Sequence, residues 1–170
     1  MNRRSILSVS AVTVLALAVM TGSAVSQQRS LKDQLVGTWT LVSSVDVHPD
    51  GSRSERFGPN SKGSLVFDGN GRYSLMIVRA DLPKFGKAPD QGSAEENKAV
   101  MQGMVAHFGT YSVNEADKSV TTRVEGSWFP NLVGSDQKRM IMSLTSDELK
   151  YGNPATAFGT KAEVAWRRAK

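Results

Sequence analysis

The sequence contains no cysteine and only two histidines, His48 and His107, among its 170 residues. Without cysteine the chain can form neither disulfides nor cysteine-ligated zinc sites, and it cannot carry the lipid-modified cysteine of a bacterial lipoprotein. Neither histidine has a carboxylate cluster beside it at metal-ligand spacing. The sequence therefore predicts no metal site, and no motif in it indicates a cofactor.

Several catalytic motifs are also missing. The sequence has no Gly-x-Ser-x-Gly elbow, no His-Glu-x-x-His pair, no phosphate-binding glycine loop and no dinucleotide fingerprint. These absences argue against the common hydrolases, zinc peptidases and nucleotide-dependent enzymes. The excess of positive charge is small, with 21 basic against 16 acidic residues, and it is spread along the chain. We therefore expect no binding of nucleic acid.

The N-terminal segment has the pattern of an export signal. Arg3 and Arg4 precede an uncharged apolar stretch over residues 6–20, and small residues follow at positions 24–26. The stretch is shorter than the roughly 20 residues that span a membrane as a helix, and no second one follows. We therefore expect a signal peptide over residues 1–26, of the general secretory or twin-arginine type. The protein would be periplasmic or secreted, without stable membrane insertion after cleavage.

The remaining chain, residues 27–170, has the size of one domain. Its 144 residues carry 19 basic and 16 acidic side chains, a net charge of +3. A chain of this length buries about two-thirds of its unfolded surface, so it folds without metal or disulfides. The sequence predicts a single domain over this range and leaves the oligomeric state open.

Alternation of apolar and polar residues dominates this domain. In residues 38–48, one face carries Trp39, Leu41, Val45 and Val47, which indicates a half-buried strand. Turn-forming residues at 49–52, 68–71 and 114–118 separate further alternating segments. In the later strands we expect these residues to face inward: Met140, Met142, Leu144, Val164 and Trp166.

About eight or nine short strands joined by turns predict an all-β, antiparallel sandwich or barrel. A closed barrel is favoured because it leaves no unpaired strand edge. One helix interrupts the strands: Ser93 and Glu96 form a capping-box pattern, and apolar residues at spacings of three and four follow. We expect this amphipathic helix over about residues 94–105. Either it forms a lid next to a binding site, or it merely covers one end of the barrel.

Ordered short motifs add a resemblance to a known family. The motifs are Leu35-Val36-Gly37-Thr38-Trp39, Phe57-Gly58-Pro59, Phe108-Gly109-Thr110-Tyr111, Val124-Glu125-Gly126-Ser127, Pro130-Asn131, Gly134-Ser135-Asp136-Gln137 and Trp166-Arg167. Together they resemble the bacterial and fungal lipocalin-like domain family over about residues 31–168. One departure is Thr121-Thr122-Arg123, where the family pattern suggests a histidine before the Val-Glu-Gly-Ser segment. The resemblance implies a cup-shaped barrel with an internal cavity, in a family without one agreed activity.

The resemblance also implies how one end of the barrel closes. In such barrels the opening tryptophan, here Trp39, commonly lies against a basic side chain of the last strand. We expect Arg167 to be that side chain, with Arg168 as the alternative. Such a cation–π contact contributes about 0.5–2 kcal/mol.

Inward positions on the central strands are the candidates for ligand contact. They are Tyr73, Leu75, Ile77, Arg79, Tyr111, Thr122, Met140 and Met142. These residues would form an apolar wall with a few polar groups, as small-molecule pockets do. Alternatively, the barrel is filled by its own side chains, because an eight-stranded barrel has an interior just wide enough for them. Arg79 either pairs with a ligand carboxylate or caps the rim.

Three titratable residues have simpler explanations. We expect His48 to be solvated next to a turn and His107 to be structural, although His107 could point into the barrel mouth. Alternation places Glu125 opposite Val124, so an outward, salt-bridged carboxylate is favoured over a buried acid or base.

Two functions remain open on the sequence alone. The first is an exported protein that binds a small hydrophobic or amphipathic molecule in the barrel without catalysis. The second is a cofactor-free enzyme of the cyclase or isomerase kind, in which the barrel orients a reactive substrate and Tyr73, Tyr111 or Arg79 assists.

Overall fold

The computed structural model describes residues 29–170, so the predicted signal peptide lies outside the described residues. The sheet consists of β1 (Gly37–Val47), β2 (Arg53–Ser54), β3 (Lys62–Phe67), β4 (Arg72–Val78), β5 (Met104–Asn114), β6 (Ser119–Ser127), β7 (Asp136–Leu144), β8 (Glu148–Asn153) and β9 (Lys161–Arg168). The helices are α1 (Leu31–Leu35) and α2 (Ala94–Gly103), with short 3-10 turns η1 (Pro89–Gln91) and η2 (Pro130–Leu132).

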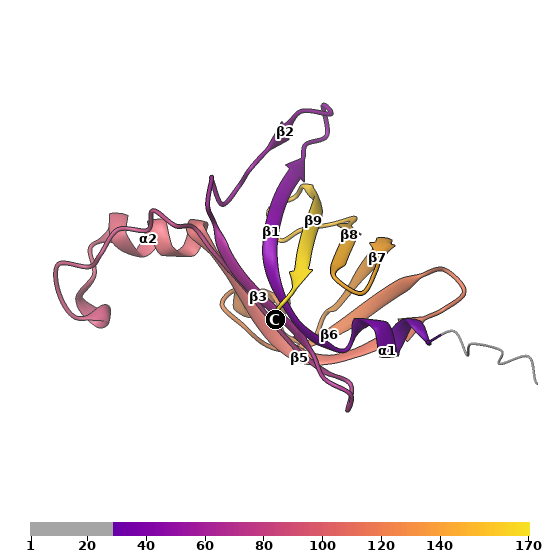
Figure 1. Ribbon diagram of the computed structural model, residues 1–170. Helices are drawn as coiled ribbons and strands as arrows, with labels where there is room; N and C mark the ends of the chain where they lie inside the picture. The colour runs from indigo at the N-terminus through magenta and orange to yellow at the C-terminus, as the bar shows by residue number, and fades with distance from the viewer. Residues whose placement is uncertain (1–28) are drawn as a thin grey trace, which may run out of the picture.

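All pairings between strands are antiparallel, and each strand from β3 to β9 lies next to its sequence neighbour. The barrel closes because β1 pairs with β3 on one side and with β9 on the other. The two-residue β2 adds to the far end of β1. Figure 1 shows β1 and β9 side by side where the ring closes. The predicted antiparallel barrel is thereby confirmed.

Helix α2 has the predicted start and an earlier end. The capping box is complete: Ser93 accepts a hydrogen bond from the Glu96 backbone, and the Glu96 carboxylate accepts one from the Ser93 backbone. The helix ends at Gly103 rather than at Val105, because β5 begins at Met104 and its residues pair with β4 from there on. In Figure 1, α2 and the preceding loop extend away from the barrel.

A β-bulge in β1 changes which of its side chains face inward. Trp39 and Leu41 face inward as predicted, but the pairing with β9 shifts register between Leu41 and Ser43. Beyond the shift, Ser44 and Asp46 are buried, and Val45 and Val47 are not. The prediction for the two valines was therefore wrong, because one extra residue in a strand moves every later side chain to the other face.

The closed end of the barrel is a packed apolar core around Trp39. This side chain is fully buried, and its Nε1 donates a hydrogen bond to the Leu35 carbonyl of α1 at 2.9 Å. The Arg168 guanidinium lies 4.1 Å from the Trp39 ring centre and donates to the carbonyls of Gln34 and Val36. Helix α1, which the sequence analysis missed, thus supplies the core residue Leu35 and one acceptor for the closing arginine, and its C-cap residue Val36 supplies the other.

The basic residue that closes this end is Arg168 and not Arg167. Register pairs Trp39 with Arg168, and paired residues share one face of the sheet, so Arg168 lies over the tryptophan. Arg167 is exposed on the opposite face. Gly37 adopts a φ of 137°, and a Cβ atom there would lie 2.5 Å from Arg168 Nη1. The Gly-x-Trp motif is therefore explained by close packing of this arginine against the backbone.

Candidate functional site

The interior of the barrel is hollow at the end away from Trp39. The cavity has a volume of about 70 Å³ and lies among the end of β1, the end of β4 and the starts of β5, β7 and β9. A water molecule needs about 10–15 Å³ of such space, so the cavity accommodates one small group or several waters. The barrel is therefore neither a wide cup nor a completely filled core.

The cavity has an apolar wall and an aromatic mouth. The wall is formed by Leu75, Ile77, Val105, Ala162 and Val164. The mouth is formed by side chains from the connecting segments: Phe57, Trp128, Leu132 and Phe158. Most of these mouth side chains are only half-buried, so the cavity meets solvent there. No residue of α2 lines the cavity, but the Met101 carbonyl of this helix accepts a hydrogen bond from Trp128 Nε1 at the mouth, at 3.4 Å.

The predicted contact residues are spread over three levels of the barrel. Leu75 and Ile77 line the cavity itself. Tyr73 and Thr122 lie deeper, around a void of about 10 Å³ that is too small to hold more than one water. Tyr111 belongs to the packed end, where its hydroxyl donates to the Asp68 carbonyl at 2.7 Å and its ring packs edge-on against Phe67.

Three of the predicted contact residues lie outside the barrel interior altogether. Arg79 forms an ion pair with Asp81 at 2.7 Å beyond the end of β4. Met140 and Met142 are 39% and 60% exposed, so their predicted inward orientation was wrong. The inward residues of β7 are Arg139 and Ile141, since register pairs Arg139 with the buried Val120. Leu144 still packs against the core, because a register shift between Ile141 and Ser143 returns it to the inside.

Arg139 is one of the cavity residues that sequence reasoning missed. It is only 7% exposed and lines the cavity from β7. Its Nη1 donates to the Lys138 carbonyl at 3.2 Å and to Asn153 Oδ1 at 3.3 Å, and its guanidinium faces the Tyr151 ring with 6.0 Å to the ring centre. No carboxylate of residues 29–170 forms an ion pair with it. Burial lowers the pKa of Arg139, but an arginine remains charged in proteins.

His107 also points into the barrel, where it contacts Tyr73. Its Nδ1 lies 2.9 Å from the Tyr73 hydroxyl, and the side chain is 6% exposed. Burial, together with the positive charge of Arg139, lowers the pKa of His107 to about 4. Burial likewise raises the pKa of Tyr73. Both groups are therefore neutral near pH 7, and they form a satisfied polar pair within the wall.

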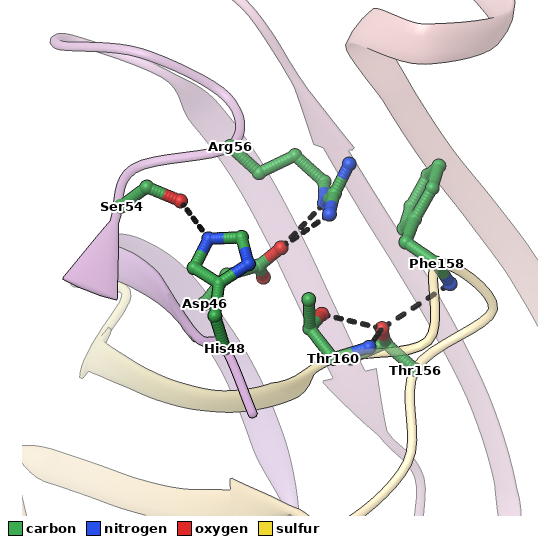
Figure 2. A network of polar contacts seen from close by, with 7 residues as sticks. All are labelled: Asp46, His48, Ser54, Arg56, Thr156, Phe158 and Thr160. Atoms are coloured by element: carbon green, nitrogen blue, oxygen red, sulfur yellow. Dashed lines mark hydrogen bonds and ion pairs between the residues drawn. The ribbon is translucent and has the colours of Figure 1, made fainter. Parts of the chain in front are cut away.

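One buried ion pair lies at the rim of the cavity, and Figure 2 shows its surroundings. Asp46 is 2% exposed and accepts a hydrogen bond from Arg56 Nε at 2.6 Å. The Arg56 guanidinium lies 3.9 Å from the centre of the Phe158 ring, in the loop between β8 and β9. That loop is held by Thr156, whose hydroxyl lies 2.8 Å from the Thr160 hydroxyl. The rim is thus fixed by polar contacts between β1 and two connecting segments.

Two further expectations concern groups outside the cavity. His48 Nε2 lies 2.8 Å from the Ser54 hydroxyl, at the edge where β2 joins β1. Glu125 forms an ion pair with Arg72 at 2.8 Å, and about two-fifths of its side chain is exposed. The predicted outward, salt-bridged position of Glu125 is confirmed. Neither residue lines the cavity.

The positions of Tyr73, Tyr111 and Arg79 bear on the hypothesis of a cofactor-free enzyme. Tyr111 donates its hydroxyl to a backbone carbonyl, and Arg79 is paired with Asp81, so neither faces the cavity. Of the three assisting residues in that hypothesis, only Tyr73 contacts another polar group of the interior. Residues 29–170 bring together no group of three or more potential metal ligands. Nor does this part of the chain contain a helix long and apolar enough to span a bilayer.

Comparison with known sequences decides the family. Residues 36–169 match the family model described as the lipocalin-like domain. The chain belongs to the lipocalin-like domain family. The resemblance drawn from the short motifs is therefore confirmed, and a lipocalin-like barrel fold goes with it. No curated protein matches this lipocalin-like chain in sequence.

Several solved structures resemble this lipocalin-like protein. A lipocalin-like protein from Bacteroides uniformis is 16% identical, with a TM-score of 0.43 over 80% of this chain and 99% of that chain. A redesigned β-barrel is 13% identical, with a TM-score of 0.45 over 84% and 98% of the two chains. Bovine odorant binding protein in complex with a selenium-containing odorant is 15% identical, with a TM-score of 0.42 over 84% of this chain and 74% of that chain.

Proposed function

We propose that this protein binds a small amphipathic molecule in the barrel cavity and does so without catalysis. The observation that carries the proposal is the cavity itself, which has an apolar wall with a few polar groups and is bounded by aromatic side chains at its mouth. This composition is typical of small-molecule sites. Its volume of about 70 Å³ restricts the enclosed part of the ligand to a small group. A longer ligand would extend through the mouth past Trp128 and Phe158.

A cavity-filling variant tests this proposal. Val164 lines the cavity, and Val42 is 50% exposed on the outside of the barrel, so Val164→Phe and Val42→Phe make the same change inside and outside. We expect wild type and Val42→Phe to bind a neutral aromatic probe such as benzamide, observed as chemical-shift changes of the Trp128 indole. Val164→Phe should abolish these changes and remain folded by circular dichroism.

Native mass spectrometry of protein purified from its own host provides a second test. A co-purifying small molecule that is lost from Val164→Phe and kept by Val42→Phe supports the proposal. Wild-type protein that carries no such mass and binds no apolar probe contradicts it.

We further propose that the protein is exported to the periplasm or beyond. The proposal rests on Arg3, Arg4, the apolar stretch and the small residues at 24–26. N-terminal sequencing of protein from the host envelope should give Gln27 as the first residue. Replacing both arginines by lysine distinguishes the two export routes, because a twin-arginine signal loses function and a general signal does not. Intact protein that stays in the cytoplasm would refute export.

A further inference from the structure

The inner end of the cavity contains a buried positive charge without a counter-charge. Arg139 is 93% buried, and its two hydrogen bonds go to neutral acceptors on Lys138 and Asn153. Both are long, at 3.2 and 3.3 Å, and both leave from Nη1, so neither uses Nε or Nη2. Burying an ion is costly unless it is paired and fully hydrogen-bonded. Arg139 therefore has hydrogen bonds to neutral acceptors and faces the Tyr151 ring, but no carboxylate of residues 29–170 balances its charge.

The groups around Arg139 are suited to an anion. His107, Gln137 and Asn153 line the same part of the cavity and are neutral near pH 7. The carboxylate that shares the cavity, Asp46, is already paired with Arg56 at the rim. An incoming negative charge would therefore meet one unbalanced positive charge and several neutral hydrogen-bonding groups.

We infer that Arg139 binds the carboxylate of a ligand whose short apolar or aromatic body lies toward the mouth. This inference rests on the proposed function and specifies its ligand as a monocarboxylate. The planar guanidinium matches two coplanar carboxylate oxygens. One guanidinium balances one carboxylate, whereas a phosphate monoester would leave excess negative charge in a site of low polarity. The apolar wall and the aromatic mouth then cover the rest of the ligand.

The test compares benzoate with benzamide, which have the same shape and differ in charge. Wild type, Arg139→Met and Arg167→Met are titrated with both probes and followed by amide chemical shifts. Arg167 is the matched control, because it is exposed on the outer face of β9 and its loss changes the net charge equally. We expect wild type and Arg167→Met to bind benzoate about tenfold or more tightly than benzamide. In Arg139→Met this ratio should fall to about one.

The titration of His107 provides a readout that needs no variant. Arg139 contributes to lowering its pKa, so a carboxylate bound at Arg139 should raise that pKa, and benzamide should not. This result would support the inference even if Arg139→Met failed to fold. Equal affinity for the two probes in wild type, with an unchanged His107 pKa, overturns the carboxylate assignment and leaves cavity binding intact. If wild type binds neither probe, the proposed function itself fails, and the inference fails with it.

Discussion

The two ends of the barrel differ in how their buried polar groups are satisfied. At the closed end, Trp39 donates to a carbonyl, and Arg168 both covers its ring and donates to the backbone of the segment before β1. At the hollow end, Arg139 is buried without a carboxylate partner among residues 29–170. The same strand, β1, supplies Trp39 to one end and Asp46 to the other. The packed end and the proposed ligand site are therefore separated along the strands rather than between domains.

Replacing Trp39 at the closed end and Trp128 at the mouth should give the largest difference in unfolding free energy between the two ends. Trp39→Ala should lower the free energy of unfolding by about 3–5 kcal/mol, because it leaves a large cavity in the packed end. Trp128→Ala should cost less than half as much, since Trp128 is only half-buried at the mouth. Urea denaturation of both variants gives the two values. Equal losses would contradict the view that the packed end contributes more to stability than the hollow end.

Acidic pH should lower the stability of the protein, because His107 at the hollow end is buried in its neutral form. The pKa of His107 falls from 6.5 to about 4 on folding, so the unfolded state takes up the proton first as the pH drops. The contribution of His107 to the free energy of unfolding is then complete above pH 6.5. It decreases by about 3 kcal/mol in total as the pH falls to about 4. Urea denaturation between pH 4 and 7 measures this decline. His107→Gln should reduce the dependence, and an unchanged dependence in this variant would refute the assignment.

A buried and an exposed ion pair near β2 allow a sharper comparison. Arg56→Met should destabilise the protein by about 1–3 kcal/mol, because it leaves the buried Asp46 carboxylate without its partner. Arg53→Met removes an exposed pair with Glu163 and should have no measurable effect. Thermal unfolding of the two variants tests this order. A larger effect at Arg53 would contradict the argument.

Only a small change in stability is expected at Arg139. In the absence of ligand, Arg139→Met should leave the free energy of unfolding within about 1 kcal/mol of wild type or raise it, because it removes an uncompensated buried charge and keeps most of the volume. Ligand-free protein, checked by mass spectrometry, is compared by urea denaturation. A loss of several kcal/mol would contradict the argument that the charge of Arg139 is uncompensated in the ligand-free protein.

Much of the fold was predictable because it depends on local patterns. Alternating residues indicated the strands, turn residues separated them, and the Ser93–Glu96 capping box located the start of α2. Closure between β1 and β9 followed from the need to remove unpaired edges. The bulges in β1 and β7 were not predictable in this way, because a bulge depends on how two strands pair and not on the composition of one.

The site was predicted less well than the fold for the same reason. Leu75 and Ile77 were correctly placed by alternation, which has no interruption in β4. In β7 the methionines were assigned to the inside because they are apolar, but the strand presents Arg139 there instead. One signal was present in the sequence: Ile141 alternates with Arg139 and Gln137 on the opposite face from the methionines. Whether any of these residues contacts a ligand stays a prediction.

The pairing of β1 with β9 has a consequence for how the protein forms. The closing ladder joins the first and the last long segment of the domain, and Ala169 still donates to the Thr38 carbonyl. Contacts between residues so distant in sequence are slow to form, because a long loop must be ordered first. A chain that lacks its final residues exposes both strands of the seam. The ring is therefore completed only after the entire polypeptide has become available, and until then both unpaired edges can associate with other chains.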